Sequence, residues 1–346
     1  MYRRAISKWA VLCVMWAAPL QAWWTMGHRL VGYIGEQNLD PKTRTLLEPL
    51  LHESIEPYNE GLTQSLSSFP DASIWFDYVK NNKIPGLRKT HYINIPLSFE
   101  EMNQTLTREE VMNRLNQATK ENPYNVIDCI NWSMYQLAGY FSDEQVTPER
   151  AAALRYLLHL IGDLHQPLHV ISLILPDGQG DEGGNKIRLS QSIDVEDLDH
   201  DVQRIDKLHK VFDSAFGSIV QDSEHGATKP RRDREKILDQ AYQDLKKKFG
   251  NQSDEFHSIS EWAVSTFLIA QTQIYQQIQI KEDFQDEKGS FFADFRTSPA
   301  QYKKSVTPVI QKLIWQGGIH LAEILNALRV QKYQYPFVKK NWGPML

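Results

Sequence analysis

The feature of this 346-residue sequence that most constrains its fold is a histidine and an aspartate inside an otherwise apolar helix. The segment TPERAAALRYLLHLIGDLHQPLH, residues 147–169, predicts a helix that Thr147 caps and Pro148 begins. His159 and Asp163 are four residues apart, so they share one face of that helix. Because an unpaired buried carboxylate is costly, we expect either a cation or a hydrogen-bonded polar network beside Asp163.

Further histidines and aspartates extend this pattern. Pro167 ends or bends the predicted helix, so the chain can turn His169 back toward the same cavity. In KLHKVFD, His209 and Asp213 are again four residues apart and can share a helix face. Imidazole and carboxylate are the ligands that zinc takes where no thiolate is available. The spacing favours a metal site, although one histidine taken alone is more often a hydrogen-bonded core residue.

Asp77 and His91 are two more candidates, in the segment IWFDYVKNNKIPGLRKTHYINIP. They are too far apart in the sequence to share one helix turn. They can therefore meet only through the fold, and each taken alone is more often an ordinary polar residue.

The N-terminal residues 1–22 are typical of a secretory signal peptide. Basic residues precede a short apolar stretch, Trp9 to Leu20, and Ala22 suits cleavage. The stretch is too short for a membrane span, although a short retained anchor is the alternative. Cleavage would give Trp23 a free α-amino group with a pKa near 7.7–8.0, which could chelate a metal together with the Trp23 carbonyl and His28. Trp23 as a plain core residue is the other interpretation.

Charge and cysteine content exclude some classes of protein. Without residues 1–22 the chain has 35 basic and 43 acidic residues, a net charge of about −8. A protein that holds polyanions on a basic face would look different, so any positive charge for phosphate must come from elsewhere. Cys129 is then the only cysteine, which leaves packing or metal to hold the fold. No second long apolar run is present, so we expect no stable membrane association.

Apolar periodicity predicts an all-α fold, a single mainly helical domain over residues 23–346. Long helices are expected at 258–278 and from the Thr307-Pro308 pair onward, and Thr107 with Glu110 forms a predicted capping box. A short β-hairpin or strand is expected near 185–195, followed by an acidic loop. The basic run KPRRDREK at 229–236 contains two acidic residues and is typical of a solvated helix face.

Taken together, these residues resemble the zinc-dependent, single-strand-specific nucleases typified by mung bean nuclease. The resemblance includes HxxGDxHQPLH at 159–169, GGN at 183–185 and the closing LIWQGGIHLAEILN, and it extends over nearly the whole chain from Trp23. Zinc-dependent bacterial phospholipase C has the same helical fold. The five-residue step from Trp23 to His28, and an aspartate at 213 instead of glutamate, favour the nucleases.

The resemblance implies three Zn²⁺ ions. Trp23, His28 and Asp163 would hold the first, and Asp163 would bridge it to the second. The remaining implied ligands are Asp77, His91 and His159 for the second ion and His169, His209 and Asp213 for the third.

The resemblance also implies an activity. Single-stranded DNA and RNA would be hydrolysed to products with 5′-phosphates, and 3′-mononucleotides would be dephosphorylated. Asp77 would orient the attacking water and Lys80 would stabilise the phosphate, while Tyr92 and Asn94 would contact a base. Asn94 stands where fungal and plant members have Asp, and the acidic segment between Asn185 and His209 is longer than theirs.

The location and state expected for such a protein follow from these interpretations. We expect a monomer that is secreted or periplasmic after removal of residues 1–22. The alternatives are a zinc-dependent phospholipase C and a catalytically silent, zinc-stabilised binding protein.

Overall fold

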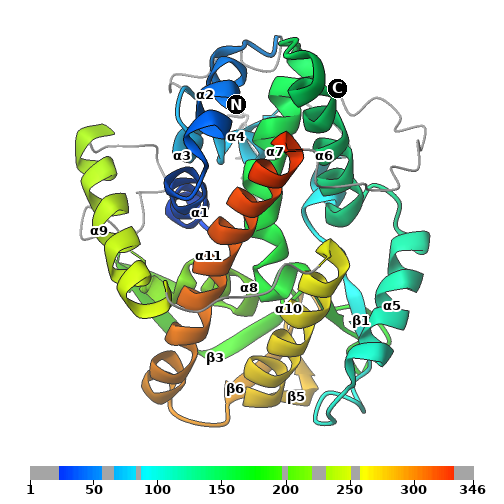
Figure 1. Ribbon diagram of the computed structural model, residues 1–346. Coiled ribbons are helices and arrows are strands. Elements are labelled where there is room, and N and C mark those ends of the chain that lie inside the picture. The colour runs from blue at the N-terminus through cyan, green and yellow to red at the C-terminus, as the bar shows by residue number, and fades with distance from the viewer. Residues whose placement is uncertain are drawn as a thin grey trace, which may run out of the picture.

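The computed structural model describes residues 23–56, 66–82, 87–196, 202–219, 231–250 and 258–330. Within these ranges the chain is mainly helical with two small sheets, which confirms the predicted fold class (Figure 1). The predicted signal peptide lies outside the described residues. None of the helices in the described ranges combines the length and the apolar composition needed to cross a membrane.

A buried helix, α7 (Pro148–Leu164), runs through the centre of the molecule (Figure 1). Every residue from Ala151 to Leu164 is buried, which is why this stretch is apolar on all sides apart from Arg155, His159 and Asp163. Its start follows the sequence prediction, because the Thr147 side chain accepts a hydrogen bond from the Arg150 N–H (3.3 Å). The helices that pack against α7 include α1 (Thr25–Gln37), α2 (Pro41–His52), α3 (Phe69–Ala72), α4 (Trp75–Asn82), α6 (Val126–Asp143), α10 (Ile259–Gln273) and α11 (Pro299–Arg329).

Helix α11 starts earlier than the sequence predicts. Ser298 and Gln301 form a capping box at its N-terminus, and the helix continues through Pro308 to Arg329. Proline removes one backbone donor, and this 31-residue helix tolerates that loss because it packs against α1, α6 and α7. The predicted helix start at Thr307-Pro308 was therefore wrong.

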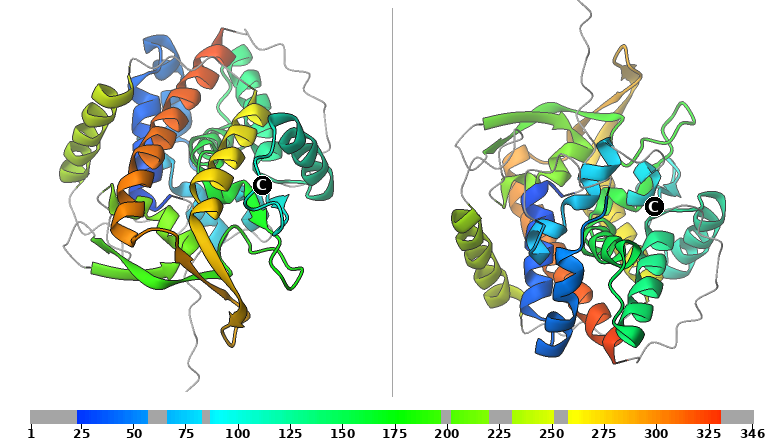
Figure 2. Two further views of the ribbon diagram at one scale, coloured as in Figure 1. Left: turned by 90° about the horizontal axis from the view of Figure 1, so that it is seen from below. Right: turned by 90° about the horizontal axis from the view of Figure 1, so that it is seen from above.

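The outer helices flank this central group. Helix α5 (Arg108–Glu121) begins at the predicted capping box of Thr107 and Glu110 and packs against α10. Helix α9 (Arg231–Phe249) lies at the periphery beside α1 and α11 (Figure 2). The remaining helical turns are α8 (Leu208–Asp213) and the 3-10 segments η1 (Leu87–His91), η2 (Pro167–His169), η3 (Ala215–Gly217) and η4 (Tyr275–Gln277).

A two-stranded parallel sheet joins two segments that are far apart in the sequence. Strand β1 (Ile95–Leu97) pairs with β2 (Ile171–Leu173), with Ile95 opposite Ile171. Each strand follows a predicted metal ligand, His91 before β1 and His169 before β2. The pairing is extended by a hydrogen bond from the Ile93 N–H to the His169 carbonyl (2.9 Å). These two histidines are thereby held beside each other.

The second sheet is larger than the sequence predicts. Strand β3 (Ile187–Glu196) confirms the strand expected near 185–195, and the strand order is β4-β3-β6-β5. Strand β4 (Val202–Lys207) occupies part of the predicted acidic loop. Helix α10 ends at Gln273, and β5 (Ile278–Gln285) pairs with β6 (Phe291–Phe295) beyond it. The predicted helix over 258–278 was thus too long, because its last residues belong to η4 and begin β5.

Candidate metal centre

The C-terminal half of α7 supplies His159 and Asp163 to a fully buried site. Helix α1 brings His28 against them, with the His28 and His159 rings stacked at 3.8 Å between centroids. Gly162 makes this approach possible, since a Cβ there would lie 3.0 Å from His28 Nδ1. Trp23 is also fully buried, and its indole Nε1 donates to the Gly162 carbonyl (2.8 Å). The N-terminal segment is thereby fixed next to Asp163.

The two carboxylate oxygens of Asp163 face different histidines. Asp163 Oδ1 lies 3.4 Å from His28 Nε2, whereas Oδ2 lies 2.9 Å from His91 Nδ1 and 3.3 Å from His159 Nε2. Asp77 approaches from α4, with Oδ1 at 3.8 Å from His91 Nδ1 and 3.7 Å from His159 Nε2. Two adjoining groups of ligand atoms result: His28, His159 and Asp163 form one, and Asp77, His91 and His159 form the other. His159 belongs to both groups, and Asp163 has one oxygen toward His28 and the other toward His91.

A third group forms around Asp213 at the end of α8. His209 Nε2 lies 3.3 Å from Asp213 Oδ2, and His169 Nε2 lies 4.0 Å from Oδ1. Gln166 donates to Asp213 Oδ1 (2.6 Å) and fixes the carboxylate. The Asp213 carbonyl accepts from the Trp24 N–H (2.8 Å), which ties this group to the N-terminal segment. The structure therefore brings all nine predicted ligand residues into one buried region. Eight of them form the three groups, and Trp23 lies beside the first group through its bond to the Gly162 carbonyl.

Main-chain carbonyls determine which imidazole nitrogen carries the proton. A carbonyl oxygen can only accept a hydrogen bond, so a ring nitrogen that faces one must be protonated. The Nδ1 atoms of three histidines donate in this way: His159 to Ser73 (2.8 Å), His169 to His91 (2.8 Å) and His209 to Gly183 (2.6 Å). Neutral rings then present the Nε2 lone pair to the centre, which is the form that binds a metal.

The model of the S1/P1 nuclease family matches residues 23–329 of this chain. The chain belongs to the S1/P1 nuclease family. It is 26% identical over 324 residues to Endonuclease 2 of Arabidopsis thaliana, covering 91% of this chain and 93% of that protein. It is also similar to Endonuclease 1 of the same plant, 25% identical over 331 residues, with 93% and 92% covered. The family identifies the protein as a nuclease, a hydrolase that acts on nucleic acid.

The donor set of this S1/P1 nuclease fits divalent metal ions. Imidazole nitrogen and carboxylate oxygen are zinc ligands, and each group places three such residues so that their ligand atoms lie within 4.8 Å of one another. Three aspartates, Asp77, Asp163 and Asp213, are buried in this one region. A cation in each group would compensate the cost of burying these carboxylates. The groups can therefore hold metal, as the sequence pattern predicts.

Two other predicted site residues, Tyr92 and Asn94, lie close to His91 in the chain. Tyr92 directly follows His91, Asn94 comes two residues later, and both are partly buried. Burial raises the pKa of the Tyr92 hydroxyl, the nearby Arg88 lowers it and Glu182 raises it. Asn94 has a positive φ of 23°, a backbone conformation that asparagine tolerates better than most residues. Lys80 belongs to α4, but its side chain lies outside the described residues.

Sequence reasoning missed the residues that orient the ligands. Gln166 stands inside HQPLH, and its position between two histidines of the motif was the available signal. The carbonyls of Ser73 and His91 had no signal, because a backbone acceptor can occur at any residue type.

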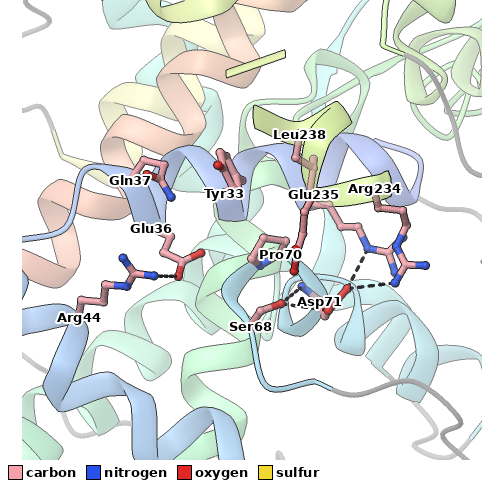
Figure 3. A pocket seen from close by; sticks show the side chains of 11 residues that line it. Tyr33, Glu36, Gln37, Arg44, Ser68, Pro70, Asp71, Arg234, Glu235 and Leu238 are labelled. Atoms are coloured by element: carbon pink, nitrogen blue, oxygen red, sulfur yellow. Dashed lines mark hydrogen bonds and ion pairs between the residues drawn. The ribbon is translucent and has the colours of Figure 1, made fainter. Parts of the chain in front are cut away.

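A cavity of about 290 Å³ lies on another face of α1 and is separate from this centre (Figure 3). Asp71 lies between two arginines there, with Oδ1 at 3.3 Å from Arg29 Nε and 4.0 Å from Arg234 Nη2. Its lining contains three arginines and three carboxylates in all: Arg29, Arg44, Arg234, Glu36, Asp71 and Glu235. With these charges balanced, the cavity offers no net attraction for a phosphate, and we assign it a structural role between α1, α3 and α9.

Proposed function

We propose that this S1/P1 nuclease hydrolyses phosphodiester bonds in single-stranded DNA and RNA, using three Zn²⁺ ions, and leaves 5′-phosphates. The observation that carries the proposal is Asp163, whose two oxygens face His28 on one side and His91 with His159 on the other. A carboxylate shared in this way suits a pair of bridged metal ions. We also propose that 3′-mononucleotides are substrates, because the same centre would accept their phosphate.

The proposed ligand sets are those that the family resemblance implies, drawn from the residues of the three groups. The first ion would be held by the Trp23 amine and carbonyl with His28 and Asp163, and the second by Asp77, His91, His159 and Asp163. The third would be held by His169, His209 and Asp213. The Trp23 amine requires removal of residues 1–22, so the proposal includes export and a mature protein that is secreted or periplasmic. A monomer without stable membrane association is part of the same proposal.

Zinc bound in these groups would supply a Lewis acid that polarises the phosphate and acidifies water near neutral pH. The protein's own residues supply orientation. The Asp77 side chain is 9% exposed, the largest exposure in its group, so it can accept a hydrogen bond from a water that enters and direct it at the phosphorus. Lys80, three residues later, would add positive charge for the phosphate.

Single-strand preference has a physical reason in this proposal. Tyr92 would stack on an unpaired base and Asn94 would hydrogen-bond to it. A base inside a duplex must first be unstacked and unpaired, which costs a few kcal/mol. Base preference would then depend on Asn94, which can donate as well as accept.

The decisive experiment compares denatured DNA, duplex DNA and phosphatidylcholine vesicles as substrates for mature protein confirmed to start at Trp23. We expect cleavage of denatured DNA to 5′-phosphate ends, slower cleavage of the duplex, loss of activity after chelation and recovery with Zn²⁺. Lipid hydrolysis without DNA hydrolysis would indicate the phospholipase reaction instead. No hydrolysis of any substrate by zinc-loaded protein would indicate a silent binding protein, and activity that survives exhaustive chelation would contradict the metal assignment.

A further inference from the structure

A fully buried carboxylate, Asp181, lies close to the third ligand group without belonging to it. Its Oδ1 accepts hydrogen bonds from the Leu173 N–H (2.9 Å) and the Ser172 hydroxyl (3.2 Å) at strand β2. Its Oδ2 accepts from the Tyr275 hydroxyl (2.6 Å), which comes from η4. Asp181 therefore joins two elements that are about a hundred residues apart in the sequence.

The same carboxylate holds the glycine turn that follows it. Asp181 Oδ1 accepts from the Gly183 N–H (3.0 Å), and Oδ2 accepts from the Gly184 N–H (2.9 Å). Residues 182 to 184 all have positive φ, between 55° and 84°. A Cβ at Gly183 would lie 2.1 Å from the Leu168 carbonyl oxygen, so the turn can pass Leu168 only as glycine. The conformation of this turn thus depends on glycine and on the internal acceptor, Asp181.

The turn contacts a predicted metal ligand, His209. The Gly183 carbonyl accepts from His209 Nδ1 (2.6 Å), and the Gly184 carbonyl accepts from the His209 backbone N–H (3.3 Å). The first contact requires a proton on Nδ1 and leaves the Nε2 lone pair facing Asp213 Oδ2 at 3.3 Å. A shift of the Gly183 carbonyl would remove the contact that selects this tautomer.

We propose that Asp181 is a positioning residue for the third metal: it fixes the Gly183–Gly184 turn, so that the Gly183 carbonyl orients His209 and selects its Nε2 for the ion. The proposal rests on the proposed three-metal function. Asp181 acts through the backbone of the turn, which distinguishes it from the ligands and from Gln166, which contacts Asp213 directly.

The hydrogen bonds around Asp181 explain why an aspartate occupies this place. Burial raises the pKa of Asp181 to about 6 even though the hydrogen bonds from Tyr275 and the backbone act to lower it. All five groups around its two oxygens donate hydrogen bonds, which is the environment that suits an ionised carboxylate. Asparagine has nearly the same shape but one acceptor oxygen, so it cannot accept from both glycine N–H groups through separate oxygens.

The test compares Asp181→Asn with a matched control, Asp286→Asn. Asp286 also holds a turn, since its Oδ1 accepts from the Lys288 N–H (2.9 Å) and the Ser290 N–H (2.8 Å) beside Gly289, which has a φ of 76°. That turn carries no predicted ligand. Two quantities are measured: zinc stoichiometry and affinity by competition with a chelator, and the His209 tautomer in metal-free protein by long-range ¹H–¹⁵N NMR.

We expect Asp181→Asn to bind the first two zinc ions as the unmodified protein does and the third about 10- to 100-fold more weakly. In metal-free Asp181→Asn, the His209 tautomer with its proton on Nδ1 should no longer predominate. Asp286→Asn should change neither zinc binding nor this tautomer. Tyr275→Phe removes one of the donors that hold the Asp181 carboxylate in place and spares the donors of the turn, so it should weaken binding of the third zinc to a smaller extent. If Asp181 had a purely structural role, Asp181→Asn would only lower the melting temperature or would weaken binding of all three zinc ions alike.

Third-site affinity and a His209 tautomer that are both unchanged in folded Asp181→Asn would overturn the proposal. If that variant does not fold, the same unchanged result in Tyr275→Phe overturns it. Neither measurement uses activity, so an unmodified protein that binds three zinc ions but cleaves no nucleic acid would refute the proposed function alone. An unmodified protein that binds no third zinc would overturn both.

Discussion

Three histidines of the metal centre are oriented by backbone atoms. His159, His169 and His209 donate from Nδ1 to carbonyls of other segments, so the path of the main chain determines where each Nε2 points. Asp163 and Asp77 differ from them, because their oxygens face several imidazoles at once. At the scale of single residues, the proposed roles are therefore separable: the histidines and Asp163 would hold metal, while Asp77 would combine metal binding with access to solvent.

Replacing Asp77 by Asn tests that separation. We expect hydrolysis of denatured DNA to fall by at least about 100-fold, because the amide is a weaker acceptor for the attacking water. The fold should be largely spared, since the amide occupies nearly the same volume. The measurement is steady-state hydrolysis together with the melting temperature. Persistence of activity near the unmodified level would show that Asp77 does not orient the water.

Among the elements, helix α7 leaves little space for larger side chains. It is buried from Ala151 to Leu164, and Gly162 lies where α1 and the N-terminal segment approach it. An alanine would normally stabilise a helix interior relative to glycine by about 1 kcal/mol. Here the added Cβ would lie 3.0 Å from His28 Nδ1 and 3.7 Å from Trp23 Cδ1, so tertiary contact opposes helix propensity.

Gly162→Ala should therefore weaken the first metal group and lower stability by about 1–3 kcal/mol, as overpacking does in a dense core. Gly317→Ala in α11 is the matched control, because the nearest atom to its added Cβ would be 3.5 Å away, at His165. That control should be neutral or stabilising. Urea denaturation and zinc stoichiometry measure both variants, and equal behaviour of the two would contradict the packing argument.

An ion pair joins α5 to the turn after β1. Arg114 donates to both oxygens of Glu101 (2.6 and 2.8 Å). These bonds from Arg114, with others from Ser98, lower the pKa of Glu101 from 4.5 to about 2. A depressed folded-state pKa stabilises the protein above pH 4.5, and that stabilisation is lost as the pH falls toward 2.

Glu101→Gln should consequently destabilise metal-free protein by about 0.5–1 kcal/mol at neutral pH, the size typical of partly exposed pairs. The difference from the unmodified protein should shrink as the pH falls below 4.5, where the unfolded glutamate becomes protonated. Urea denaturation as a function of pH measures it, with the exposed neighbour Glu100→Gln as the control. A difference that stays constant across this pH range would exclude the ion pair as its source.

At the scale of the whole molecule, the proposed metals connect segments from most of the chain. The ligand groups draw on α1, α4, η1, α7, η2 and α8, and the parallel pairing of β1 with β2 holds η1 beside η2. Cys129 is the only cysteine beyond residue 22, so no disulfide within that part of the chain performs this task. A ligand that binds only the folded state adds about 4 kcal/mol to the free energy of unfolding when its free concentration exceeds its Kd 1,000-fold.

We therefore expect exhaustive chelation to lower the melting temperature by several degrees and Zn²⁺ to restore it. Acid should have the same effect as chelation, because protonated imidazoles cannot bind metal. Differential scanning calorimetry with and without chelator measures this. Mg²⁺ at the same concentration is the control and should not substitute, since it prefers oxygen ligands. An unchanged melting temperature after chelation would exclude metal as the link between these segments.

The sequence by itself determined the local features of this protein. Helix periodicity, the cap at Thr147 and the four-residue spacings of His159 with Asp163 and of His209 with Asp213 depend on neighbouring residues, and all appear as predicted. The family resemblance also followed from motifs of this kind. Such features are readable because backbone geometry alone places residues four apart on one helix face.

Only the tertiary structure decided which distant residues meet. Asp77 and His91 approach α7 because α4 and η1 pack there. Strands β4 and β6 form because each pairs with β3, and β5 forms because it pairs with β6. The continuation of α11 through Pro308 and the hold of Asp181 on the Gly183–Gly184 turn have the same origin. These outcomes depend on packing and hydrogen bonds between residues far apart in the chain, and local propensity contains no information about those partners.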